Sequence, residues 1–81
     1  MGREPREYVI RGQIVQLGAE ELLVIVRAFV TTRLSPGDTM HETVRVACME
    51  DAKVEQRLLV RSMAERLQKQ GHVIANVETD F

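Results

Sequence analysis

Residues 21–32 read ELLVIVRAFVTT, which is the longest apolar run in the sequence. The run is apolar on both alternating faces, and β-branched residues dominate it. This pattern is typical of a strand that is covered on both sides, although a buried helix can have the same composition. The β-branched content and the two closing threonines favour the strand. We therefore expect the fold to be organised around this segment.

Two further strands are expected, one before and one after this run. Residues 8–17 alternate with β-branched content, and Gly18-Ala19-Glu20 is short enough to form a hairpin loop. Residues 40–49 alternate again, and they follow Ser35-Pro36-Gly37-Asp38, which predicts a turn. Three strands joined by two short turns form an antiparallel meander.

A helix is expected next, from an N-cap at Asp51 to about Gln70, with Gly71 ending it. Its apolar positions form one stripe, with Gln56 inside it: Ala52, Leu59, Val60, Met63, Ala64 and Leu67. Residues 73–79 predict a short fourth strand, whose neighbour in the sheet stays open. The order is βββαβ, and the fold class is α+β: a three-stranded antiparallel meander, one covering helix and a short fourth strand.

The length of 81 residues predicts a single domain over residues 8–81, preceded by a flexible arm at residues 1–7. A chain this short buries only about 60% of the surface that its unfolded form exposes, so self-association is a common route to stability. The single cysteine forms no internal disulfide, and the charged start resembles neither a signal peptide nor a membrane span. These features predict a cytoplasmic protein.

The alternation also predicts the register. When the even-numbered residues of the three strands face the helix, that face is almost wholly apolar, and it includes Cys48. A slip of one residue would place Arg11 or Arg45 in the core. Burying an unpaired guanidinium costs on the order of several kcal/mol, which exceeds the roughly 1 kcal/mol cost of a less favourable turn.

The opposite face, with the odd-numbered residues, is the predicted binding site. Pairing Arg11 with Arg27, and Arg27 with Arg45 across a turn centred on Pro36, places three arginines in one row. Opposed like charges destabilise a sheet, and arginine among apolar side chains is typical of interface cores. The predicted binding residues are Arg11, Arg27, Arg45, Phe29, Ile25 and Gln13.

Three interpretations of this face stay open. In the preferred one, it is a protein interface that joins copies of the chain or binds another protein, as a regulator or inhibitor would. In the alternative, the three-stranded sheet binds DNA or RNA, although a net charge of −1 and the absence of Trp count against that function. In the third, an additional element covers the face and the arginine stems shield its apolar atoms.

The helix offers a second candidate interface on the side opposite its apolar stripe. Val54 and Leu58 lie there beside Arg57 and Arg61. Two apolar side chains among arginines suggest a contact, although scattered apolar residues are normal on protein surfaces.

The sequence predicts no catalytic activity. Cys48 on the inner face and His41 on the outer face cannot form a nucleophile–base pair. His72 follows the C-terminal end of the helix, where the helix dipole favours a histidine. Neither a metal-ligand spacing nor a glycine-rich phosphate loop is present, so we expect no metal, no cofactor and no small-molecule ligand. The expected function is that of a non-enzymatic binding module.

Overall fold

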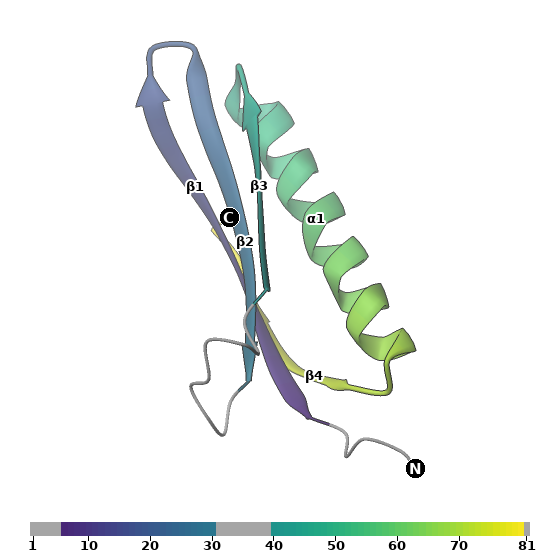
Figure 1. The fold of residues 1–81 in the computed structure, drawn as a ribbon. Coiled ribbons are helices and arrows are strands. Elements are labelled where there is room, and N and C mark those ends of the chain that lie inside the picture. Colours follow the sequence, from purple (N-terminus) through teal and green to yellow (C-terminus); the bar gives the residue numbers. More distant parts are fainter. Residues whose placement is uncertain (1–5, 31–39, 81) are drawn as a thin grey trace.

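The computed structural model describes residues 6–30 and 40–80, and it is an α+β fold with one sheet and one helix (Figure 1). The elements follow the predicted βββαβ order: β1 (Glu7–Gly18), β2 (Glu21–Val30), β3 (Met40–Val46), α1 (Met49–Lys69) and β4 (Val73–Glu78). β1 begins at Glu7, which was predicted to belong to the arm. The rest of that arm up to residue 5 and the predicted turn at residues 35–38 lie outside the described residues.

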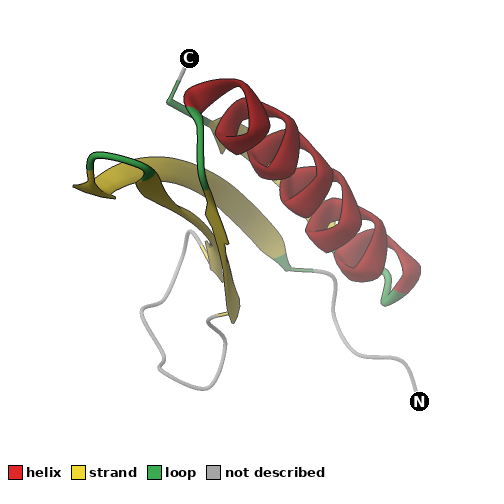
Figure 2. Cartoon of the chain, turned by 90° about the horizontal axis from the view of Figure 1, so that it is seen from above, coloured by secondary structure: helices red, strands yellow, loops and turns green. Residues whose placement is uncertain are grey.

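The four strands form a mixed sheet in the order β3-β2-β1-β4. The predicted meander β1-β2-β3 is antiparallel throughout, and β4 pairs in parallel with the outer edge of β1. Because β3 and β4 are opposite edges of the sheet, α1 carries the chain from one edge to the other. The helix lies across a single face (Figure 2).

The register of the first hairpin is as predicted, with Arg11 opposite Arg27. Every odd-numbered residue of β1 from Val9 to Val15 has an odd-numbered partner on β2. A register shift between Gln16 and Gly18 then accommodates the two-residue turn at Ala19 and Glu20. The predicted register of the second hairpin is wrong: Arg27 lies opposite His41, and Arg45 lies opposite Leu23. The pairing is displaced by four residues, which keeps the same side chains on the same face.

The even-numbered residues of the strands pack against α1, as predicted. Ile10, Val24, Val26 and Ala28 are fully buried, together with Ala52, Met63 and Leu67 from the helix. Leu59, Val60 and Ala64 are partly buried against this core. The apolar stripe therefore covers the inner face, and Val54 and Leu58 point to solvent.

The two ends of α1 differ in how well they match the sequence prediction. The helix begins after Cys48, which is the N-cap, whereas the predicted cap Asp51 lies inside the first turn beside Glu50. Cys48 was expected in the core but is exposed, because β3 ends at Val46 before the alternation reaches it. The C-terminal end is as predicted.

That C-terminal end is a Schellman motif. The N–H of His72 donates to the carbonyl of Leu67 at 3.0 Å, and the N–H of Gly71 donates to that of Gln68 at 3.0 Å. Gly71 has a φ angle of 89°, which a residue with a side chain rarely adopts. The reversal aims β4 at β1, where the N–H of Val73 donates to the carbonyl of Arg6 at 2.9 Å.

Gly12 allows the helix to approach the sheet next to β4. A Cβ atom at this position would lie 2.6 Å from Gln56 Oε1, so Gln56 packs directly on the backbone of β1. The side-chain amide nitrogen of Gln56 donates to the carbonyl of Asp80 at 2.8 Å. This hydrogen bond holds the segment that follows β4 against the helix. Gln56 is the one buried polar side chain among the described residues.

None of the helices in the described part of the chain is long and apolar enough to span a membrane.

Candidate interaction surface

We use the name outer face for the side of the sheet opposite α1. It carries the odd-numbered residues of β1, β2 and β3, and no helix or strand of the described residues lies over it (Figure 2). Most of its apolar members are half-buried (Val9, Val15, Leu23, Ile25 and Phe29), and Leu17 is exposed. Its charged and polar members are exposed: Glu7, Arg11, Gln13, Glu21, Arg27, His41, Thr43 and Arg45. The outer face therefore combines partly exposed apolar surface with charged side chains, among which arginine is the most frequent.

Arg11 is held in place on both sides. Its Nη2 atom lies 3.0 Å from Glu78 Oε1 on β4, and its Nε donates to the same oxygen at 3.1 Å. The guanidinium carbon also lies 5.4 Å from the centre of the Phe29 ring. These contacts offset the repulsion between Arg11 and Arg27, which are direct neighbours across the strands.

Arg45 is separate from the other two arginines. It shares the outer face with them but lies near the β1–β2 turn, because of the four-residue displacement of β3. Its Nη1 atom lies 3.4 Å from Glu21 Oε2, and its side chain is 73% exposed. An exposed pair of this length contributes little to stability. The predicted row of three arginines is therefore reduced to Arg11 and Arg27, with His41 in the third place.

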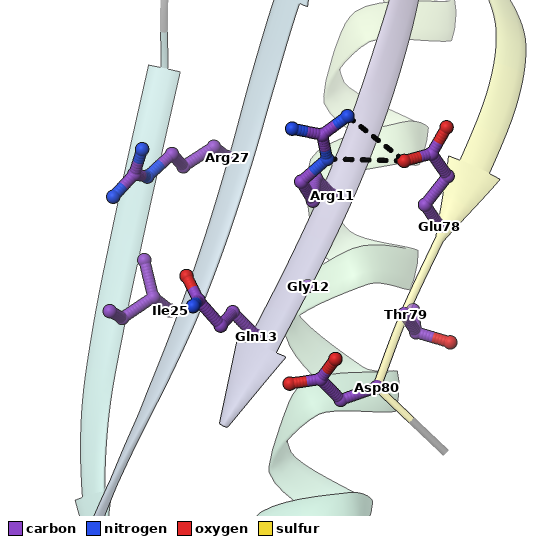
Figure 3. A pocket seen from close by; sticks show the side chains of 8 residues that line it. All are labelled: Arg11, Gly12, Gln13, Ile25, Arg27, Glu78, Thr79 and Asp80. Atoms are coloured by element: carbon purple, nitrogen blue, oxygen red, sulfur yellow. Dashed lines mark hydrogen bonds and ion pairs between the residues drawn. The ribbon is translucent and has the colours of Figure 1, made fainter. Parts of the chain in front are cut away.

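Arg27 differs from the other two because its guanidinium makes no ion pair or hydrogen bond within the described residues. It lines an open hollow of about 420 Å³ together with Ile25, Gln13 and Arg11 (Figure 3). Figure 3 shows the Arg27 side chain directed away from Arg11 and toward β3. A guanidinium beside half-buried apolar side chains can form strong paired contacts with a carboxylate of a docking molecule.

The opposite wall of the hollow is acidic, a feature that was not predicted from the sequence. Glu78 lies there with Asp80, whose Oδ2 accepts a hydrogen bond from the N–H of Ile14 at 3.0 Å. The N–H of Asp80 donates to the carbonyl of Gly12 at 3.3 Å, so the residue continues the β1–β4 ladder. The alternating acidic residues Glu78 and Asp80 are visible in the sequence. Their place on the sheet could not be predicted, because it depends on which strand pairs with the fourth strand.

The second candidate interface keeps its predicted exposure. Val54 and Leu58 are 53% and 51% exposed, and the neighbouring Arg57 and Arg61 are also exposed. Val54 and Leu58 are on the side of α1 that points away from the sheet. The geometry therefore does not connect this surface with the hollow on the outer face.

The remaining candidates for chemistry are dispersed. His41 lies on β3 at the outer face, Cys48 caps the start of α1, and His72 contacts the Tyr8 ring at a centroid distance of 5.1 Å. Nδ1 of His72 accepts a hydrogen bond from the N–H of Arg6 at 3.3 Å. Among the described residues, no group of three or more His, Cys, Asp or Glu side chains is placed to hold a metal ion.

No protein-family model, no curated protein and no solved structure matches the chain.

Proposed function

We propose that this chain is a small protein-interaction module that associates with itself through the outer face of its sheet. The observation that carries the proposal is Arg27, whose guanidinium has no partner among the described residues. It lies between half-buried Ile25 and Phe29 on a face that no described element covers. Arginine next to aromatic and aliphatic side chains is the composition found at the centre of protein interfaces.

The size of the fold supports the same proposal. One helix covers one face of a four-stranded sheet, so half of the sheet surface contributes nothing to the core of a single copy. A second molecule on the outer face would remove Val9, Leu23, Ile25 and Phe29 from water. At about 25 cal/mol per Å² of apolar surface, this burial favours association.

Nucleic-acid binding by the same face is the weaker proposal. Arg11 and Arg45 are already engaged by Glu78 and Glu21, and Asp80 adds a further negative charge to the hollow. A phosphate backbone would have to displace these carboxylates or approach beside them. Binding of a labelled DNA duplex at low salt that weakens steeply with added salt, and again in Arg27→Ala, would support this alternative.

Multi-angle light scattering across a range of protein concentrations tests self-association. We expect a dimer or larger assembly that Ile25→Glu dissociates, because the new carboxylate would lie within the buried apolar contact. Leu58→Glu is the matched control on the helix, and it should leave the assembly unchanged. A wild-type protein that stays monomeric at high micromolar concentration would contradict the proposal, and dissociation by Leu58→Glu alone would move the interface to the helix.

A further inference from the structure

The sheet has two open edges, and they differ in how well they could accept a further strand. The strand order β3-β2-β1-β4 leaves β3 and β4 at the margins, and no described strand pairs with the far side of either. On β3, Glu42 points to the helix side of the sheet, and its Oε2 lies 2.9 Å from Arg66 Nη2. A strand added there would cover this ion pair, and inward-pointing charges of this kind protect an edge from pairing.

The edge of β4 has no such charge on its helix side. Val77 lies there opposite Ile10 of the core, yet it is 44% exposed. Thr79 follows on the same side, whereas Glu78 and Asp80 lie on the outer face. A strand beside β4 would remove Val77 from water, which favours pairing.

The backbone of β4 can also bond to a further strand. Ala75 is skipped in the pairing of β4 with β1, so the regular part of the edge begins after it. The N–H of Asp80 donates to a carbonyl of β1 at the end of this part. Because successive peptide groups point to opposite sides of a strand, those of Val77 and Thr79 point away from β1. Each offers one N–H donor and one carbonyl acceptor to an added strand.

A hollow of about 250 Å³ lies between this edge and α1. Val60 of the helix and Val77 of the strand form its apolar part, and Arg57 and Lys53 line it toward the start of the helix. The guanidinium of Arg57 makes no ion pair or hydrogen bond within the described residues. None of the described residues that line the hollow carries a carboxylate. The hollow therefore suits an aliphatic side chain next to a negative charge.

The helix and β4 are aligned so that an added strand would reach both parts of the hollow. α1 runs opposite to β4, and the hydrogen bond from Gln56 to the segment after β4 fixes their alignment (Figure 1). Arg57 is therefore level with Thr79. Val60, which lies about one turn further along α1, is level with Val77. In a strand paired with β4, the side chains opposite Val77 and Thr79 both point to the helix.

The charge of the hollow decides between a second copy and a different partner. Two β4 strands that pair about a two-fold axis run antiparallel, so both helices lie on the same side of the joined sheet. Arg57 and Lys53 of one copy would then face the same cations of the other copy. A partner segment that carries a carboxylate has no such conflict.

We propose that the open edge of β4 binds an extended, acidic segment of another protein as an additional strand of the sheet. An aliphatic side chain of that segment packs on Val60 and Val77, and a carboxylate two residues away from it binds Arg57. In this mode of recognition the backbone hydrogen bonds supply affinity and alternate side chains supply specificity. The site is independent of the proposed function, because the edge of β4 lies outside the contact proposed for the outer face.

Nuclear magnetic resonance with a short synthetic peptide tests the added strand. The probe is Thr-Glu-Thr-Val-Thr-Glu-Thr with blocked ends, a pattern that is the same in both strand directions. At saturation with the probe, we expect exchange of the Val77 and Thr79 amide hydrogens to slow about tenfold, and exchange in β3 to stay unchanged. Thr79→Pro removes one outward N–H group without breaking the ladder to β1, so it should weaken binding about tenfold.

Charge exchange tests the carboxylate contact. Arg57→Glu should weaken binding of the probe about tenfold, and it should strengthen binding of a second peptide in which lysine replaces glutamate. Arg61→Glu is the matched control, because Arg61 is an exposed arginine of the same helix that does not line the hollow. It should leave the dissociation constants of both peptides unchanged.

The outcomes separate this site from the proposed self-association. Absence of binding by the acidic peptide at about 1 mM would overturn the β4 site. Unchanged binding in Thr79→Pro, or slower exchange in β3 instead of β4, would exclude strand addition at β4, and equal binding of the two peptides would exclude the charge complementarity. Ile25→Glu, which alters only the outer face, should bind the probe as the wild type does, so either proposal can fail without the other.

Discussion

The two faces of the sheet are built from the same strands, yet consecutive residues differ in burial because their side chains lie on opposite faces. On the inner face, Val24 and Val26 are fully buried under α1, and each contact adds to the stability of one copy. On the outer face, Ile25 is half-buried and Arg27 is exposed without a partner within the described residues. We therefore expect substitutions one position apart to affect different properties. A substitution on the inner face should change the free energy of unfolding, and one on the outer face should change the proposed self-association.

The largest expected effect is on the inner face, at Met63. This side chain is fully buried at the centre of the helix stripe, so Met63→Ala leaves a cavity. We expect the free energy of unfolding to fall by about 2–5 kcal/mol in urea denaturation. Leu58→Ala on the exposed side of the same helix should change it by less than about 0.5 kcal/mol. Equal losses in the two variants would mean that α1 does not pack by its predicted stripe.

The next effect tests how closely the helix approaches the inner face at Gly12. Gly12→Ala places a methyl group 2.6 Å from Gln56 Oε1, and we expect a loss of about 1–3 kcal/mol in the free energy of unfolding. Gln56→Ala opens space for that methyl group, so the double variant should be less destabilised than the sum of the two single variants. Strict additivity in this double-mutant cycle would show that the two residues do not touch.

On the outer face the expected effects on unfolding are smaller. Glu78→Gln removes the ion pair with Arg11, in which the side chains are 56% and 49% exposed for Arg11 and Glu78. The expected loss is only about 0.2–1 kcal/mol at low salt, since solvent screens such pairs. Thermal unfolding at low and high salt measures it: the difference from wild type should shrink as salt screens the pair. A difference that salt does not change would assign the effect to packing rather than charge.

The smallest effect is expected at Arg45. Its ion pair with Glu21 is long and its side chain largely solvated, so Arg45→Ala should change the free energy of unfolding by less than about 0.5 kcal/mol. Chemical denaturation measures this value, and the dissociation constant of the proposed dimer should also be unchanged. A clear loss of association in Arg45→Ala would extend the proposed interface toward the β1–β2 turn.

The sequence was sufficient to predict the faces of the sheet but not the alignment of β3. The alternation of apolar and polar residues decides only between odd and even registers, and the four-residue displacement that moves Arg45 away from Arg27 keeps that parity. The first hairpin lacked this ambiguity because its loop is short. For the second, the prediction rested on a turn centred on Pro36, which lies outside the described residues.

The acidic side of the hollow could not be predicted for a different reason. Glu78 and Asp80 reach the outer face only because β4 pairs with β1, and a short final strand can join either edge of a meander. The burial expected for Cys48 was also wrong, since the alternating pattern continued past the point where β3 gives way to α1. Local periodicity predicts which way a side chain points within an element, but it does not predict where the element ends.

The parallel pairing of β4 with β1 has a consequence for how the protein acquires its structure during synthesis. Glu7 and Val73 are partners in the sheet although more than sixty residues separate them along the chain. The hairpin and the helix can form as soon as they leave the ribosome, whereas one margin of β1 stays open until the final strand emerges. Such long-range closure slows folding, and an open strand margin invites pairing with other nascent chains. A short C-terminal truncation would therefore be expected to cause aggregation before it causes loss of secondary structure.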